Sequence, residues 1–197
     1  MNFQNNKLTD FIFVDSNAIP SNLSDYVIKK SNDYQWQTHT WYGPNKDKAA
    51  SADQSYAMVS GDEKEFDRAI IDKQTSMQLN SYIKNSVNQY KKLHQIVAPI
   101  SFNSTIAINK YTPGTRMKNH SDHIYSLFDG SKKGIPVLSV VGLLNDDFYG
   151  GDFTFWQNYK VTLKKGDILI FPSLFLYSHG VEEIKEGTRY SIVLWYW

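Results

Sequence analysis

The sequence predicts an α+β fold in which helices in the first half pack on the outer face of an antiparallel β-sandwich or barrel. First, short β-branched and aromatic runs separated by turn residues follow one another from Ser101 onward, with no helical stretch between them. Second, both amphipathic helical patterns lie before residue 100. Third, 197 residues without a linker-like tract suffice for one core, so we expect a single domain over residues 1–197.

Seven predicted strands account for most of the second half of the chain. They are short, and turn-forming pairs such as Pro113-Gly114 and Gly150-Gly151 separate them. The two adjacent glycines indicate a turn that needs unusual φ angles. The predicted strands are Thr105–Tyr111, Val137–Leu144, Asp152–Trp156, Tyr159–Leu163, Asp167–Phe171, Tyr177–Ile184 and Thr188–Trp197.

The first hundred residues contain an apolar run (Phe11–Val14), two predicted helices and a polar segment that we interpret as support for the β-rich part. One helix follows Pro20-Ser21 and places Leu23, Tyr26, Val27 and Lys30 on one stripe. Residues 39–65 are polar, and we expect a long surface loop there. The second helix ends before Pro99 and carries apolar residues at the three-and-four spacing: Leu79, Tyr82, Ile83, Val87, Tyr90 and Leu93.

The composition excludes several classes of function. The 21 Lys+Arg and 20 Asp+Glu residues nearly cancel, which disfavours a nucleic-acid partner. No apolar run approaches eighteen residues and the amino terminus lacks the layout of a signal peptide, so we expect a cytoplasmic protein without membrane contact. Because the chain has no cysteine, any metal would be bound by histidine, carboxylate or water.

The stretch Lys118–His123, KNHSDH, contains two of the five histidines and a carboxylate. If it is extended, side-chain alternation places His120 and Asp122 on one face and turns His123 to the other. A third ligand would come from a neighbouring strand, and His179 lies in the predicted strand near the carboxyl end. Two imidazoles and one carboxylate leave three coordination positions open, as in non-haem Fe(II) oxygenases. An isolated His-x-Asp pair is more often a surface hydrogen-bonded pair.

The two remaining histidines, His39 and His94, are interpreted as structural. His94 lies near the end of the second helix, where a cation is favoured. The candidate residues for chemistry therefore lie in the second half of the chain.

Arg189 lies ten residues after His179 in the predicted last strand. Alternation places Ser191, Val193 and Trp195 on the face of Arg189, and an arginine is costly to bury there without a partner. A ligand carboxylate held by the guanidinium, with the Ser191 hydroxyl beside it, would provide that partner. A buried ion pair is the alternative interpretation.

At these residues the chain resembles the 2-oxoglutarate- and Fe(II)-dependent dioxygenases, and among them the prolyl 4-hydroxylase-like branch. The resemblance rests on His120-Ser121-Asp122, on His179 and on Arg189 with Ser191 in GTRYSIVLWYW. It includes Tyr111-Thr112-Pro113-Gly114, GGDFTFW and KKGDILIFPS, and covers about residues 104–197 in the order of the family. It implies a double-stranded β-helix, or jelly roll, with the N-terminal helices packed on the major sheet.

The resemblance also implies roles for individual residues. His120, Asp122 and His179 would bind Fe(II), and Arg189 would bind the distal carboxylate of 2-oxoglutarate with help from Ser191. Tyr111 matches a tyrosine that reaches the cosubstrate pocket in the hypoxia-type prolyl hydroxylases, with core packing as the alternative. That subgroup has a further tyrosine before a Leu-Asn pair, whereas this chain has the run Val141–Asn145, VGLLN, without one.

The implied activity is hydroxylation coupled to oxidative decarboxylation of 2-oxoglutarate, with Fe(II) and O₂ required and ascorbate stimulatory. A peptidyl proline is the expected substrate, so a peptide or protein partner is expected. Hydroxylation of a free amino acid or another small molecule remains an alternative, as does a non-catalytic jelly-roll binding module. Residues 39–65 and 124–134 are interpreted as lids over the site.

Overall fold

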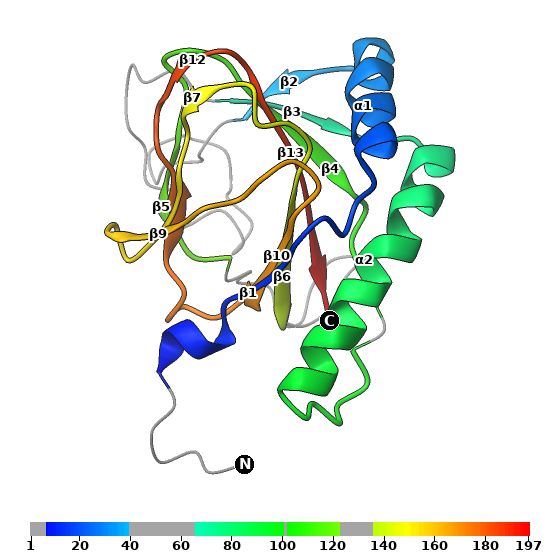
Figure 1. Cartoon of the computed structure of the whole chain (residues 1–197), viewed down its shortest axis with the longest axis vertical. Helices are drawn as coiled ribbons and strands as arrows, with labels where there is room; N and C mark the ends of the chain where they lie inside the picture. Colours follow the sequence, from blue (N-terminus) through cyan, green and yellow to red (C-terminus); the bar gives the residue numbers. More distant parts are fainter. Residues whose placement is uncertain (1–6, 40–65, 101, 123–135) are drawn as a thin grey trace, which may run out of the picture.

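The computed structural model describes residues 7–39, 66–100, 102–122 and 136–197, and it shows a mainly β protein. A large antiparallel sheet faces a smaller one, and two helices lie along the outer face of the large sheet (Figure 1). The predicted fold class is therefore confirmed. Apart from His39, the segments interpreted as lids lie outside the described residues.

The large sheet contains seven strands in the order β1-β10-β6-β13-β4-β3-β2, and all of its neighbouring pairs are antiparallel. The eight-residue strand β13 lies at its centre and pairs with β4 on one side and β6 on the other. The strands are β1 (Phe13–Asp15), β2 (Gln37–Thr38), β3 (Asp67–Ile70), β4 (Ala107–Tyr111), β6 (Leu138–Leu143), β10 (Ile168–Pro172) and β13 (Arg189–Tyr196).

The smaller sheet has four strands in the order β5-β11-β8-β9. A separate two-stranded pair, β7 with β12, lies beside it. The strands are β5 (Met117–His120), β7 (Tyr149–Gly150), β8 (Phe153–Phe155), β9 (Tyr159–Val161), β11 (His179–Val181) and β12 (Ile184–Glu186). The sandwich therefore has an interior between the large and small sheets and an outer side covered by helices.

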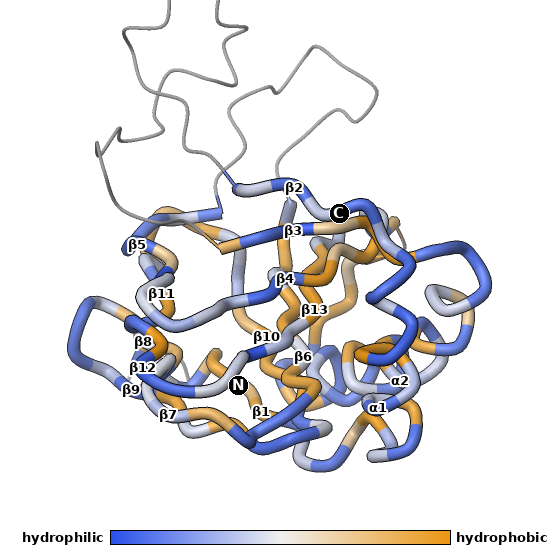
Figure 2. The backbone as a smooth tube through the Cα atoms, turned by 90° about the horizontal axis from the view of Figure 1, so that it is seen from above, coloured by the Kyte–Doolittle hydropathy of each residue, from blue (hydrophilic) through white to orange (hydrophobic). Residues whose placement is uncertain are grey.

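Alternation along the central strand separates the two cores of the molecule. Ile192, Leu194 and Tyr196 point toward the helices, whereas Val193 and Trp195 point toward the small sheet. This matches the predicted division of the last strand into two faces. Figure 2 shows apolar residues concentrated along β6, β10 and β13, between the helices and the small sheet.

Helices α1 (Ser21–Lys30) and α2 (Lys73–Leu93) form the outer layer. Asp72 is the N-cap of α2, and its carboxylate accepts a hydrogen bond from the Thr75 amide at 3.0 Å. Most of the predicted apolar stripe of α2 is buried, but Leu93 at its end is 58% exposed. In α1, Leu23 and Val27 are buried as expected, whereas Tyr26 is 40% exposed.

Three predictions of local structure need correction. The single strand expected over residues 177–184 is two strands, β11 and β12, which pair with different partners. Strand β5 ends at His120, so Asp122 lies in the connection that follows and not in a strand. The first hundred residues also contribute β1, β2 and β3 to the large sheet, which the helical interpretation of this region missed.

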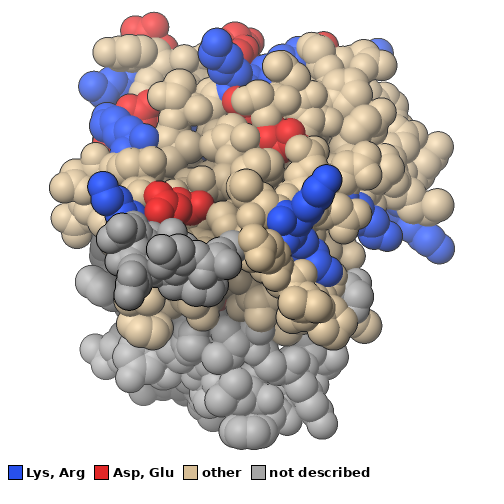
Figure 3. Space-filling model, turned by 60° about the horizontal axis from the view of Figure 1, so that its bottom comes forward, with Lys and Arg blue, Asp and Glu red and all other residues tan. Residues whose placement is uncertain are grey.

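The described helices include none that is long and apolar enough to cross a membrane. On the face shown in Figure 3, the basic and acidic side chains of the described residues are interspersed. Neither the basic nor the acidic side chains form a continuous patch on this face.

Candidate active site

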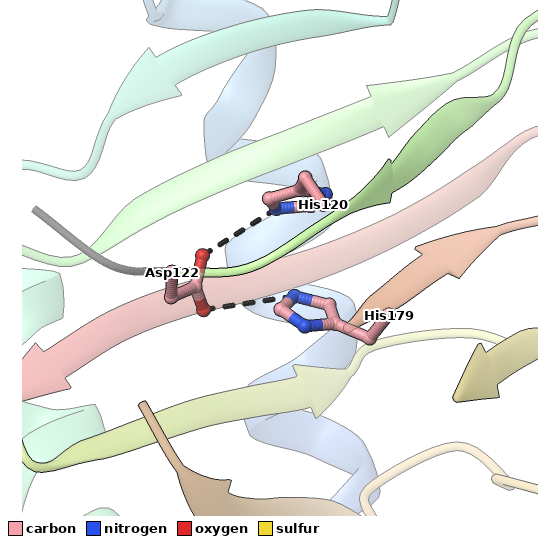
Figure 4. A group of neighbouring side chains, drawn as sticks. All are labelled: His120, Asp122 and His179. Carbon is pink, nitrogen blue, oxygen red and sulfur yellow. Dashed lines mark ion pairs between the residues drawn. The ribbon is translucent and has the colours of Figure 1, made fainter. Parts of the chain in front are cut away.

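His120, Asp122 and His179 lie together in the interior between the two sheets. The strand register places His179 of β11 directly opposite His120 of β5, and their ring centroids are 4.4 Å apart. One ligand atom from each of the three side chains lies within 4.8 Å of the other two. Both imidazoles point toward the carboxylate of Asp122 (Figure 4).

Backbone carbonyls orient both imidazole rings. Nδ1 of His120 lies 2.8 Å from the Lys118 carbonyl oxygen, and Nδ1 of His179 lies 2.9 Å from the Tyr177 carbonyl oxygen. Because a carbonyl can only accept, each Nδ1 donates its proton to the backbone, and each ring turns Nε2 toward the site. Nε2 lies 3.4 Å from the Asp122 carboxylate in His120 and 3.6 Å from it in His179.

Two serines in the interior orient the carboxylate. Ser139 of β6 donates a hydrogen bond to Oδ2 of Asp122 at 2.7 Å, and its oxygen is 2.6 Å from that of Ser173. Since the Ser139 proton is used toward Asp122, Ser173 must be the donor in the second bond. Both serines are buried, so these two hydrogen bonds are shielded from water.

The electrostatics of the site favour an ionised carboxylate and a neutral buried histidine. Burial lowers the pKa of His179 to about 4, with His120 contributing in the same direction. Burial alone would raise the pKa of Asp122, but the two histidines and the Ser139 hydrogen bond hold this pKa below its usual range. At neutral pH these protonation states are the ones that bind a metal ion.

The donor set fits a divalent cation. One nitrogen of each imidazole and an oxygen of the carboxylate converge within 4.8 Å of one another. Two nitrogens with one oxygen suit iron and similar transition metals. Hydrogen bonds from each histidine to a backbone carbonyl are also typical of metal ligands.

Arg189 lies on the same interior side of the large sheet as a buried cation. It is 1% exposed, and its Nη1 donates to the Ser191 hydroxyl at 2.9 Å. Its guanidinium lies 5.2 Å from the centroid of the Tyr111 ring, and the strand register places Tyr111 directly opposite it. No carboxylate of the described residues forms an ion pair with Arg189. The interior side of the large sheet therefore offers a cationic anchor for an anion.

Gly151 gives the Arg189 side chain the space that it occupies. The φ angles of Gly150 and Gly151 are +84° and +67°, so the predicted turn with unusual φ is confirmed. A Cβ atom on Gly151 would lie 3.2 Å from Cδ of Arg189 and 2.2 Å from Cδ1 of Ile184.

His94 and His39 have different surroundings. His94 stacks on Phe11 and packs against Tyr90, and burial lowers its pKa, so the cation expected at this helix end is disfavoured. His39 faces the interior, where its ring stacks on Phe66 at 4.5 Å. Burial, Arg68 and His120 lower the pKa of His39 to about 4, which places His39 within the electrostatic reach of the site.

Several residues near the triad were missed by sequence reasoning. Asn109 could have been found, because it lies two positions before Tyr111 in a predicted strand and so shares its face. Ser139 carries no motif, Ser173 ends the KKGDILIFPS motif without a role having been assigned to it, and Arg68 lies in a strand that was not predicted. His123, which was expected to face away, lies outside the described residues.

The fold and the site together define a non-haem iron oxygenase class: a jelly roll with a His-x-Asp and a distant histidine converging in its interior. A sequence model of the family described as "2OG-Fe(II) oxygenase superfamily" matches residues 106–197. This part of the chain belongs to the 2OG-Fe(II) oxygenase superfamily, and the enzyme class is that of 2-oxoglutarate-dependent dioxygenases, with Fe(II), 2-oxoglutarate and O₂ as the reactive partners. Among curated proteins, no relative matches the chain.

Solved structures share the fold at low sequence identity. A viral collagen prolyl hydroxylase from Paramecium bursaria Chlorella virus-1, in complex with 2-oxoglutarate, is 15% identical with a TM-score of 0.61, and the match covers 94% of each chain. A Trichoplax adhaerens prolyl hydroxylase bound to a hypoxia inducible factor peptide is 18% identical with a TM-score of 0.62, covering 96% of this chain and 84% of that one. An oxidoreductase of the 2OG-Fe(II) oxygenase family from Burkholderia pseudomallei is 14% identical with a TM-score of 0.66, covering 100% and 93%.

Proposed function

We propose that this protein hydroxylates a proline residue in a peptide, with His120, Asp122 and His179 as the ligands of Fe(II). The observation that carries the proposal is the convergence of three ligand atoms within 4.8 Å of one another, in a largely buried site on the same interior side as Arg189. The fold shared with prolyl hydroxylases, one of them bound to a peptide, supports a peptidyl substrate.

Each side chain of the site has a defined task in this proposal. The two histidines and Asp122 would hold Fe(II) through two nitrogens and one oxygen. When bound, Fe(II) supplies the redox chemistry that couples decarboxylation of 2-oxoglutarate to hydroxylation. Arg189 anchors the distal carboxylate of 2-oxoglutarate, Ser191 orients the guanidinium through its hydrogen bond, and Tyr111 covers its face.

The test is turnover with purified protein, Fe(II), 2-oxoglutarate and ascorbate. We expect formation of succinate and a gain of one oxygen atom in a proline-containing peptide, read by mass spectrometry. Succinate formation with free amino acids but with no peptide would contradict the peptidyl part of the proposal. Activity that does not increase with ascorbate would contradict that expectation alone.

The ligand assignment is tested separately. Asp122→Ala should abolish binding of Mn(II), a redox-inactive substitute for Fe(II), measured by calorimetry. Asp152→Ala is the matched control, because Asp152 is a half-exposed surface aspartate that pairs with Lys160. An Asp122→Ala protein that retains full metal affinity would contradict the assignment.

A further inference from the structure

We propose that Arg68 binds a carboxylate of the substrate, so that the enzyme selects substrates with an anionic group near the carbon that is hydroxylated. The inference rests on the proposed function, because it names the class of substrate for that same site. Neither the sequence resemblance nor the metal ligands predict it.

The sheet register places Arg68 on the face that carries the cosubstrate anchor. Arg68 of β3 lies directly opposite Asn109 of β4, and Asn109 lies directly opposite Ser191 of β13. Cross-strand partners share a face, so the two arginines lie on the same interior side of the sheet. Burial lowers the pKa of Arg68, while Tyr111 and the Asp122 carboxylate act in the opposite direction.

The side chain of Arg68 is held in place but not neutralised. Its Nε donates to Oδ1 of Asn109 at 2.8 Å, and its guanidinium lies 5.5 Å from the centroid of the Phe66 ring. Within the described parts of the chain, no carboxylate forms an ion pair with it, and no acceptor for its two terminal nitrogens is found. One hydrogen bond thus orients the guanidinium, and its two terminal nitrogens can donate together to a ligand carboxylate.

Charge balance indicates that this ligand is an anion. Burial lowers the pKa of Arg68, and the Asp122 carboxylate is among the groups that oppose this effect. A divalent cation on Asp122 would offset that influence and leave a largely desolvated guanidinium beside a metal ion. The carboxylates of 2-oxoglutarate are accounted for by the metal and by Arg189, so the compensating anion comes from the second substrate.

The structure also has room for such a group. A cavity of about 660 Å³ lies beside β2 and β3, and Gln37, His39 and Arg68 contribute to its lining together with Asp33. A volume of this size accommodates a short peptide segment or an amino acid. The ring of His39, which lines this cavity, is fixed from behind by stacking on the buried ring of Phe66.

The carboxylate can come from an acidic side chain, from a peptide carboxyl terminus or from a free amino acid, and binding measurements distinguish these sources. The protein is loaded with Mn(II) and 2-oxoglutarate, so that binding is measured without turnover. The probes are a capped neutral pentapeptide with a central proline, the same peptide with glutamate beside the proline, the neutral peptide with a free carboxyl terminus, and free proline. Calorimetry then gives the dissociation constant of each probe.

We expect at least one carboxylate probe to bind about tenfold or more tightly than the capped neutral peptide, the size expected for one charge-assisted hydrogen-bonded pair. Arg68→Gln should bring that ratio to about one. Arg68→Glu should reverse it, so that a peptide with lysine beside the proline becomes the preferred probe. Lys110→Gln is the matched control, because Lys110 lies over Trp36 on the helix-covered side, and it should keep the preference.

Three results would overturn the inference: equal binding of neutral and anionic probes, binding of no carboxylate probe, or a preference that survives in Arg68→Gln. Reversal in Arg68→Glu excludes misfolding as the explanation of a lost preference. A failure of the proposed function would differ from these, since it would appear as absence of Mn(II) binding or of succinate formation in the unmodified protein.

Discussion

At the scale of single residues, the hydrogen bond from Ser139 determines which oxygen of Asp122 is available to a metal. Oδ2 accepts the proton of Ser139 at 2.7 Å, which leaves Oδ1, on the side of His120, as the freer ligand atom. An oxygen that already accepts a strong hydrogen bond is a weaker ligand. The serine pair therefore orients the carboxylate so that it would hold a metal ion through Oδ1.

Ser139→Ala should weaken Mn(II) binding by roughly tenfold to a hundredfold, because the carboxylate loses the group that orients it. Ser86→Ala is a close control, since buried Ser86 donates to the Asp15 carboxylate at the same 2.7 Å on the outer side of the sheet. Calorimetric titration with Mn(II) measures both variants. Equal affinities for the two variants would show that Ser139 has no orienting role.

The sequence could predict the residues whose direction follows from the regular alternation of side chains along a strand. His179 and Arg189 were sought on one interior face because strand side chains alternate, and the structure places both there. Asp122 lies with these residues although strand alternation does not explain its position, because β5 ends at His120. Ser139, Ser173 and Arg68 depend on which strands become neighbours in space, and one sequence carries no periodic signal for that.

At the scale of elements, the presence of a helix or strand was predicted better than the residues at which it begins and ends. Helix α2 could be predicted because its apolar spacing extends over about four turns, and its start at Asp72 has an ordinary capping residue. The break between β11 and β12 could not be read, because the apolar run continues through it while the pairing partner changes. Strands β2 and β3 are short and polar, so they have little sequence signal.

Asp72→Ala should lower the free energy of unfolding by about 1 kcal/mol, the usual value of an N-cap. Hydrogen bonds from Thr75 hold the pKa of Asp72 below its usual range, so its contribution is present above about pH 4 and is lost as the pH falls further. Urea unfolding at pH 7 and pH 3 measures both effects. The difference between variant and unmodified protein should shrink at pH 3, and a larger difference there would contradict the argument.

Gly151→Ala should destabilise the protein more than Gly114→Ala. Both glycines have positive φ, +67° and +81°, so both variants pay for backbone strain. Only at Gly151 would the added methyl group also collide with Ile184 and press on Arg189, whereas nothing lies within 4 Å at Gly114. Thermal unfolding compares the two, and affinity for 2-oxoglutarate should fall in Gly151→Ala alone. Equal destabilisation would remove the steric part of this explanation.

At the scale of the whole molecule, the candidate site joins the two sheets. The metal ligands belong to the small sheet and its connections, while Arg189 and Ser139 belong to the large one. A metal ion with a chelating cosubstrate would therefore connect both layers through bonds that the unfolded chain cannot form.

Mn(II) and 2-oxoglutarate together should raise the melting temperature more than the sum of their separate effects. At one hundred times the dissociation constant, a ligand that binds only the folded state adds about 2.7 kcal/mol to stability. The cosubstrate needs the metal for part of its affinity, so its shift should be small without Mn(II). Addition of EDTA should reverse the increase, and a 2-oxoglutarate shift of equal size with and without metal would contradict the linkage.

The central position of β13 has a consequence for synthesis of the protein. The sheet order surrounds this strand with β6 and β4, which come earlier in the chain, and Arg189 is its first residue. A nascent chain that has emerged only to residue 188 therefore has two groups of strands, β1-β10-β6 and β4-β3-β2, with a gap between them. Such an intermediate exposes two unpaired strand edges next to apolar side chains, which is the condition that recruits chaperones. The large sheet can close only after residues 189–196 have left the ribosome, so cosubstrate binding can follow translation of this strand but cannot accompany it.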